Sequence, residues 1–251
     1  MPTLEINGAT LDYGDTGGED KPVIVLLHGW LGTWDDEFGP EIEWLRPYYR
    51  VLAPTRRGYG RSAPKPRTYP PNFYHRDAQD IIAWINALTI PHAHIAGYSD
   101  GGEVAILLPI LRPDLVRSVA AWGASGYYPP DLRVYAQRLW PPTWVDEHTR
   151  ALHGPEHIDR MVLGWINAIK QIIDSGGNIS LNEAHKITCP LLLMLGRADP
   201  LNPEYWGRQL VERAPQGRLV MFDGGHAVHR EQPEAFRKTL WEHLEAAEKS
   251  C

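Results

Sequence analysis

The chain of 251 residues has few cysteines, no long apolar run and no excess of basic residues. Cys189 and Cys251 are too few for a disulfide framework, so we expect a reduced, cytoplasmic protein. No segment approaches the roughly 18 apolar residues of a membrane span, and residues 1–10 lack the apolar core of a signal peptide. A net charge of −6 without a basic stretch argues against nucleic acid as a partner.

Patterns for metal and dinucleotide sites are also missing. His153 and His157 have the spacing of a zinc-binding helix, but the Gly-Pro pair at 154–155 interrupts the helix and the motif's glutamate is absent. The turn at 58–60 lacks the third glycine of a dinucleotide-binding loop. We therefore expect no metal and no cofactor.

The chain does contain short apolar segments that alternate with amphipathic ones. This alternation is typical of an α/β fold, with a mostly parallel, doubly wound sheet of about eight strands covered by helices on both faces. The first two predicted strands form an antiparallel hairpin, and a final helix is expected over 230–244. The predicted strands are 4–6, 10–13, 23–27, 50–53, 92–96, 118–122, 191–195 and 219–222.

Ser99 occupies the centre of a G-x-S-x-G pentapeptide, between an apolar segment at 94–96 and a helical run over 103–111. This context predicts a nucleophile elbow, a tight strand-to-helix turn that exposes a serine hydroxyl. Gly97 and Gly101 are expected because a Cβ at either position would collide with the neighbouring strand or helix. The serine is therefore a candidate nucleophile for hydrolysis.

Candidate partners for the serine follow in the order acid, then base. Asp199 comes just after the strand at 191–195, and His226 lies on a glycine-rich loop after the strand at 219–222. The carboxyl ends of parallel strands share one edge of a sheet, so both side chains should lie near Ser99. We expect His226 to act as general base and Asp199 to orient it.

Each partner has a competing interpretation. Asp199 precedes Pro200, and Asp-Pro pairs commonly form turns. His226 is one of eleven histidines, many of which must be structural. His229, three residues later, is the rival base, and we assign it a structural role at the entry to the last helix. The chain order Ser, Asp, His favours the catalytic interpretation.

An oxyanion hole needs two N–H donors aimed at the tetrahedral intermediate. The amide of Asp100, the residue after the nucleophile, is the first candidate. The loop after the third strand begins His28-Gly29, and the amide of Trp30 is the second candidate, with Leu31 as the alternative. We expect the His28 ring to fix this loop rather than to take a proton from substrate.

Between the strands that end at 122 and begin at 191, the alternation stops. We predict a helical cap over 126–187, inserted into a hydrolytic core formed by 1–125 and 188–251. Its aromatic side chains belong to the packing of the cap or line an apolar pocket over the serine. These residues are Tyr127, Tyr128, Tyr135, Trp140, Trp144 and Trp165.

Further motifs along residues 23–244 resemble the α/β-hydrolase family, and within it the biphenyl hydrolase-like proteins, or valacyclovir hydrolases. One departure is Thr55, which stands where the family usually carries Asp. The resemblance implies hydrolysis of a small-molecule ester, including α-amino acid esters, without a cofactor. The motifs lie at 37–40, 57–62, 76–80, 97–102, 122–124, 177–179 and 189–190.

The Asp100 carboxylate has two interpretations. It complements the helix dipole in the first turn after the elbow, or it binds the ammonium of an α-amino acid ester in a substrate-binding role. We favour the second, because the residue adjoins the reacting carbonyl and the resemblance points to aminoacyl esters.

Other functions use the same residues. A carbon–carbon bond hydrolase of ring-cleavage products has the same triad, but Asp100 should repel its anionic substrates. A serine perhydrolase would be revealed by peroxide-supported halogenation. A non-catalytic ligand-binding receptor would bind without turnover, and the complete set of Ser99, Asp199 and His226 makes it the least favoured alternative. The sequence leaves the leaving group and the oligomeric state open.

Overall fold

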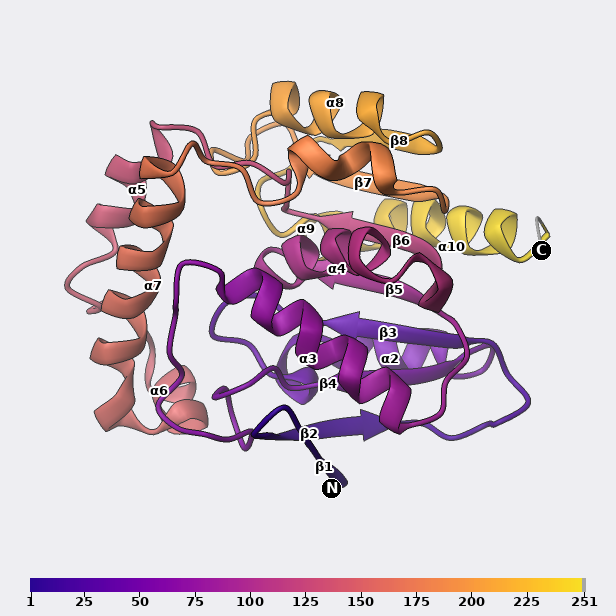
Figure 1. Ribbon diagram of the computed structural model, residues 1–251, viewed down its shortest axis with the longest axis horizontal. Helices are drawn as coiled ribbons and strands as arrows, with labels where there is room; N and C mark the ends of the chain where they lie inside the picture. Colours follow the sequence, from indigo (N-terminus) through magenta and orange to yellow (C-terminus); the bar gives the residue numbers. More distant parts are fainter. Residues whose placement is uncertain (250–251) are drawn as a thin grey trace.

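The computed structural model describes residues 1–249, in which eight strands form one sheet with helices on both faces (Figure 1). The strand order is β1-β2-β4-β3-β5-β6-β7-β8. β2 pairs antiparallel with both β1 and β4, and every other pair of neighbouring strands is parallel, which confirms the predicted hairpin and mostly parallel sheet. The bounds are β1 Thr3–Ile6, β2 Ala9–Asp15, β3 Val23–Leu27, β4 Arg50–Pro54, β5 Ala93–Tyr98, β6 Val116–Trp122, β7 Leu191–Gly196 and β8 Gly217–Phe222.

Successive residues of the central strands enter different cores. Val25 and Leu27 of β3 belong to the core that includes side chains of α3 (Phe73–Ala87) and α4 (Asp100–Leu111), whereas Ile24 and Leu26 belong to the opposite core. That second core includes side chains of α2 (Gly39–Leu45) and α10 (Pro233–Lys249). Burial on both faces explains why these strands are continuously apolar. Each large apolar side chain buried here contributes roughly 1.5–3 kcal/mol.

The connections reverse direction beside β3. The chain passes from β3 to β4 on one side and then to β5 on the other, so β3 and β5 flank a topological switch point. Ligands of open α/β sheets bind at the carboxyl ends of the strands at such a point. Ser99 follows β5 there, at the end of the sheet that faces α5, α6 and α7 in Figure 1.

Three helices connect β6 to β7 and stand at that end of the sheet (Figure 1). They are α5 (Leu132–Arg138), α6 (Glu147–His153) and α7 (Ile158–Asp174), with short 3-10 turns at Pro155–His157 and Leu181–Lys186. All lie within the segment 126–187 that we predict to be the cap, and the division into core and cap stays a prediction.

The two ends of this segment meet at Gly126. Its carbonyl oxygen accepts hydrogen bonds from the amides of Ile179, Ser180 and Leu181, at 3.0–3.1 Å. The buried Glu103 carboxylate of α4 in turn accepts the amides of Ser125 and Gly126, at 2.9 and 3.1 Å. The outgoing and returning parts of the chain therefore meet at Gly126, and Glu103 of α4 fixes this position through its hydrogen bonds.

One predicted helix boundary is wrong. Helix α4 begins at Asp100, in the first turn after the elbow, and continues through the helical run predicted over 103–111. The helix predicted over 230–244 is two helices, α9 (Val228–Glu231) and α10. Pro233 separates them, because proline disfavours a helical conformation at the preceding residue, and Gln232 has φ −133° and ψ 54°.

The remaining helices are short or peripheral to the site: α1 (Trp34–Glu37), α8 (Glu204–Arg213) and a 3-10 turn at Pro113–Leu115. Among residues 1–249, no helix combines the length and apolar character needed to cross a membrane. Cys189 is a free thiol. Cys251 lies outside the described residues.

Candidate active site

Ser99 lies in a strained turn between β5 and α4. Its φ of 53° and ψ of −121° belong to a region that residues with side chains rarely adopt. A Cβ on Gly97 would lie 2.3 Å from the carbonyl oxygen of Gly101, and one on Gly101 would lie 2.0 Å from that of Leu27. Both glycines are therefore required, because the helix packs directly against the strands.

Ser99, His226 and Asp199 form one hydrogen-bonded chain. The Ser99 hydroxyl lies 2.9 Å from His226 Nε2, and His226 Nδ1 lies 2.8 Å from Asp199 Oδ2. A carboxylate accepts only, so Nδ1 carries the proton and Nε2 is free to accept from the hydroxyl. The structure thus brings together three residues that are separated by up to 127 positions in the sequence.

Asp199 both forms a turn and contacts the histidine. Its Oδ1 accepts the amide of Leu201 at 2.8 Å, while its Oδ2 also accepts the side-chain amide of Asn202 at 3.0 Å. Burial alone would raise the pKa of Asp199, but the hydrogen bonds with His226, Asn202 and Leu201 outweigh it and lower that pKa. Asn202 was missed at the sequence level, although an Asx turn after Asp199 is a recognisable signal.

His229 is buried away from the serine. Its Nδ1 accepts the indole N–H of Trp122 at 3.0 Å, and its Nε2 lies 3.5 Å from Glu37 Oε1. The residue lies within α9, beside the Tyr98 ring. These contacts fix the imidazole in a packing role between β6 and α9.

The loop after β3 lies against the serine. A Cβ on Gly29 would lie 3.4 Å from Ser99 Cβ, so the predicted donor at Trp30 belongs to the adjacent backbone. His28 Nδ1 donates to the Gly29 carbonyl at 2.8 Å, and its Nε2 accepts the Arg56 amide at 2.9 Å. Burial and the Arg56 charge hold the pKa of His28 well below its usual value, so this ring is a neutral support of the loop.

Asp100 is fully buried at the start of α4. Its Oδ1 accepts the Tyr74 hydroxyl at 2.6 Å, and its Oδ2 accepts the Trp165 indole at 3.1 Å. Tyr74 also shares a short hydrogen bond with Tyr128. Burial raises the pKa of Asp100, opposed by Arg56, the Tyr74 hydrogen bond, Arg67 and the Trp165 hydrogen bond. The carboxylate therefore connects the elbow to the helix α7.

The aromatic residues between β6 and β7 divide into two groups. Trp165 stacks on Trp30, with ring centroids 4.3 Å apart, and Trp144 adds a third ring at 5.5 Å from Trp30. Trp140 and Tyr135 are exposed, as is Trp144. Among residues 1–249, no ring contact joins Trp140 or Tyr135 to Trp30. Only part of the aromatic set therefore faces the loop beside Ser99.

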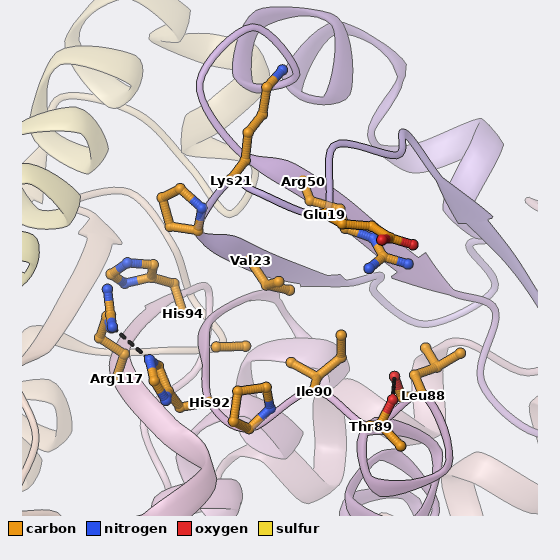
Figure 2. Close-up of a pocket in the computed structure, with 13 residues that line it drawn as sticks. Glu19, Lys21, Val23, Arg50, Leu88, Thr89, Ile90, His92, His94 and Arg117 are labelled. Atoms are coloured by element: carbon orange, nitrogen blue, oxygen red, sulfur yellow. Dashed lines mark hydrogen bonds between the residues drawn. The ribbon is translucent and has the colours of Figure 1, made fainter.

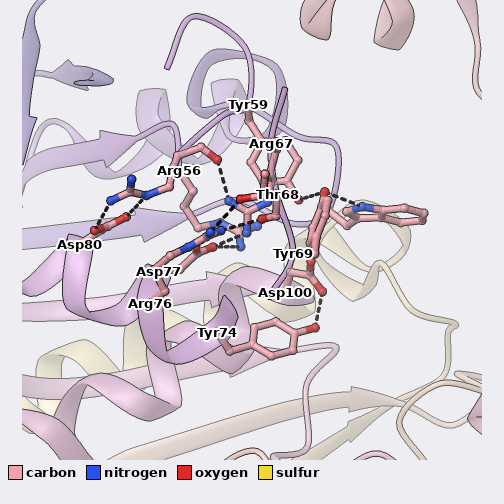
Figure 3. Close-up of polar contacts among 12 residues, drawn as sticks. Arg56, Tyr59, Arg67, Thr68, Tyr69, Tyr74, Arg76, Asp77, Asp80 and Asp100 are labelled. Carbon is pink, nitrogen blue, oxygen red and sulfur yellow. Dashed lines mark hydrogen bonds and ion pairs between the residues drawn. The ribbon is translucent and has the colours of Figure 1, made fainter. Parts of the chain in front are cut away.

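A buried ionic cluster beneath the loop was missed at the sequence level (Figure 3). Asp77 Oδ2 lies 3.1 Å from Arg56 and 2.5 Å from Arg67, and all three side chains are at most 1% exposed. Arg67 stacks over the rings of Tyr59 and Tyr69, with centroids at 4.4 and 4.8 Å. The pair Arg56-Arg57 is visible in the sequence, but a pair of arginines in a turn is ordinarily solvent-exposed.

A hollow lies at the opposite end of the sheet from Ser99 (Figure 2). It encloses about 420 Å³ around the first residues of β3, β4 and β5, where Arg117 and His92 contact each other. The amino ends of parallel strands are not where open α/β sheets bind ligands.

In residues 1–249 no three His, Cys, Asp or Glu side chains are grouped to hold a metal. His153 instead contacts Leu31 and Gly60 through its two ring nitrogens.

Known proteins with similar sequences are hydrolases. The human protein named serine hydrolase BPHL is 30% identical over 249 residues, which cover 96% of this chain and 85% of that protein. A protein of Pseudomonas savastanoi pv. phaseolicola, named putative carbamate hydrolase RutD, is 28% identical, and the alignment covers 90% of this chain and 95% of that protein. The crystal structure of the enol-lactonase from Burkholderia xenovorans LB400 has a similar fold, with a TM-score of 0.73 and 24% sequence identity. The match covers 97% of this chain and 100% of the enol-lactonase chain.

The model of the α/β hydrolase family matches residues 24–239 of this chain. That match includes all but the first residue of β3, the elbow, the segment between β6 and β7, and the loop that carries His226. Together with the eight-stranded sheet, it shows that this chain is a hydrolase of the α/β-hydrolase family.

Proposed function

We propose that this chain is a serine hydrolase that cleaves small carboxylic esters through an acyl-enzyme. The observation that carries the proposal is the hydrogen-bonded chain Ser99–His226–Asp199, with distances of 2.9 and 2.8 Å. A neutral imidazole between a hydroxyl and a carboxylate is the arrangement that activates a serine. The similarity to the human serine hydrolase supports the same chemistry.

In this mechanism Ser99 Oγ attacks the ester carbonyl carbon while His226 Nε2 takes the hydroxyl proton. Asp199 stabilises the resulting imidazolium. The amides of Trp30 and Asp100 donate to the negatively charged oxygen of the tetrahedral intermediate. Collapse of the intermediate expels an alkoxide, which receives the proton from His226. Water, deprotonated by His226, then attacks the acyl-enzyme and releases the acid and Ser99.

The Asp100 amide is suited to this role by its position. As the first residue of α4, it has no intrahelical acceptor for its N–H. The positive end of the helix dipole also lies at this terminus, where it favours a developing negative charge.

The first prediction is that Ser99→Ala abolishes ester turnover and leaves the fold intact. Loss of a triad member typically reduces the rate by on the order of 10⁴-fold or more. Turnover of p-nitrophenyl acetate should be measured together with the circular dichroism spectrum of the variant. A folded variant that keeps its activity would exclude the covalent mechanism.

We further propose that the substrates include α-amino acid esters, whose ammonium pairs with the Asp100 carboxylate. A carboxylate accepts about four hydrogen bonds, and Tyr74 and Trp165 do not use all of them. A charge-assisted hydrogen bond in a buried site is worth roughly 1.5–3 kcal/mol, or about one to two powers of ten in specificity. In the competing interpretation the carboxylate only complements the helix dipole and links α4 to α7.

The second prediction concerns Asp100→Asn, which keeps the shape of the side chain and removes its charge. The substitution should lower kcat/KM for a phenylalanine ester and leave kcat/KM for the matched 3-phenylpropanoate ester, which lacks the amine, much less affected. The first loss should exceed the second by about tenfold or more. Equal losses on both esters would leave only the structural role of Asp100. A matched aryl carbamate should be assayed beside them, since several relatives are named putative carbamate hydrolases.

A further inference from the structure

We propose that Arg56 is a positioning residue that strengthens the oxyanion hole by holding and polarising the peptide unit between Gly29 and Trp30. The inference rests on the proposed serine hydrolase function, in which the Trp30 amide is one of the two oxyanion donors. Arg56 is buried, and its guanidinium contacts Asp77 and the carbonyl oxygens of His28 and Gly29, so it acts through the loop.

The Gly29 carbonyl oxygen accepts three hydrogen bonds. They come from His28 Nδ1 at 2.8 Å, Arg56 Nη2 at 3.0 Å and the Gly32 amide at 3.3 Å. This carbonyl belongs to the same planar peptide unit as the Trp30 N–H. Among the turn and loop hydrogen bonds of residues 1–249, none is donated by the Trp30 amide. The oxygen of this peptide unit thus accepts three hydrogen bonds, whereas its N–H, that of Trp30, donates to no backbone oxygen among these contacts.

Donors on a carbonyl increase the polarity of its peptide unit. They draw electron density from nitrogen to oxygen through amide resonance, and the N–H becomes a stronger donor. Of the three donors to Gly29, only the guanidinium is a permanent cation. Hydrogen bonds from charged groups are about twice as strong as neutral ones. Arg56 is therefore the contact that should affect the Trp30 N–H most.

Arg56 also fixes the position of the loop at two further atoms. Its Nη2 donates to the His28 carbonyl at 2.7 Å, and its backbone amide donates to His28 Nε2 at 2.9 Å. The second bond leaves the imidazole proton on Nδ1, where it points at the Gly29 carbonyl. The Arg56 side chain thus binds both peptide oxygens that precede Trp30, and its backbone amide orients the His28 ring.

The charge of Arg56 has the sign that an oxyanion needs. Arg56 and Arg67 share one oxygen of Asp77, and both charges also act on the buried Asp100 carboxylate, so two guanidinium groups face two carboxylates (Figure 3). Of the two, only Arg56 donates to the carbonyls of the loop. In a buried site the Arg56 charge is weakly screened at this short distance and favours the anionic intermediate over the neutral ester.

Arg67 provides a matched control. It is as buried as Arg56 and pairs with the same oxygen of Asp77, but its Nη1 donates to the Arg57 carbonyl rather than to the loop. A role limited to the stability of the cluster would give Arg56→Met and Arg67→Met the same phenotype. A role in the oxyanion hole would separate the two variants.

The test compares wild type, Arg56→Met, Arg56→Lys and Arg67→Met on p-nitrophenyl acetate, each normalised to the fraction of chains that a fluorophosphonate labels. We expect Arg56→Met to lower kcat about tenfold with KM within twofold, a smaller loss than the 10²–10³ for removal of an oxyanion donor. The dissociation constant of an arylboronic acid, which forms an anionic tetrahedral adduct on serine, should rise in parallel. Arg67→Met should keep kcat within about twofold.

Arg56→Lys keeps the charge opposite Asp77 but cannot hold two carbonyls in a fixed fork, so its kcat should lie between those of wild type and Arg56→Met. This variant decides the question if Arg56→Met does not fold. Unchanged kcat and boronate affinity in a folded Arg56 variant, or equal losses in the Arg56 and Arg67 variants, would overturn the inference. A wild-type protein without ester turnover would instead overturn the proposed function, before any Arg56 variant is compared.

Discussion

At the residue scale, His226 and His229 differ in what their nitrogens contact. They are three positions apart on the same connection, yet His226 meets a hydroxyl and a carboxylate, whereas His229 accepts from the Trp122 indole. The His226 side chain is 24% exposed, so substrate and water can approach it, while that of His229 is 1% exposed. Proton transfer to substrate requires the first environment.

The third prediction follows from this difference. His226→Ala should lower kcat for an aryl ester by about 10⁴-fold, because Ser99 loses its base. His229→Ala should keep most of the turnover and instead lower the thermal unfolding temperature, because it removes the acceptor of a buried indole N–H. Steady-state kinetics and calorimetry on both variants measure the two effects. A reversal of the two phenotypes would identify His229 as the base.

At the element scale, Glu103 determines how α4 holds the segment between β6 and β7. Its carboxylate accepts the amides of Ser125 and Gly126, and Gly126 accepts three amides from the returning chain. Burial raises the pKa of Glu103 to about 7, although the two amide hydrogen bonds oppose that rise. The ionised form is therefore disfavoured in the native state relative to the unfolded chain.

The fourth prediction is a pH dependence of stability. A folded pKa above the unfolded value means that stability is greatest at low pH and falls as the pH rises between the two values. Relative to Glu103→Gln, the wild type should lose about 2 kcal/mol of unfolding free energy between pH 5 and pH 8. Urea unfolding of both proteins at the two pH values measures the difference. A difference that stays constant or changes in the opposite direction would contradict the assigned pKa.

At the scale of the whole molecule, the strands and the order of the candidate triad could be predicted because local patterns encode them. Continuous apolar runs mark buried parallel strands, and their carboxyl ends converge on one edge, so Asp199 and His226 could be placed near Ser99 without coordinates. The need for Gly97 and Gly101 could also be predicted from a local pattern, because the strand and helix that leave no room for a Cβ directly adjoin them in the sequence.

Other features depend on long-range packing that no local pattern reports. Asp77 pairs with arginines 10 and 21 positions away, and burial of this charged cluster runs against the usual exposure of such residues. The Asp100 carboxylate meets Trp165, which is 65 positions distant.

The fifth prediction tests the central claim, that Ser99 carries a covalent acyl intermediate. An aryl pivalate, whose bulky acyl group should be released slowly, is mixed with the protein and quenched at short times. We expect a burst of about one equivalent of phenol per chain, together with a pivaloyl mass increase on the peptide that contains Ser99. Turnover without an acyl group on Ser99, or with the acyl group on another residue, would contradict the account.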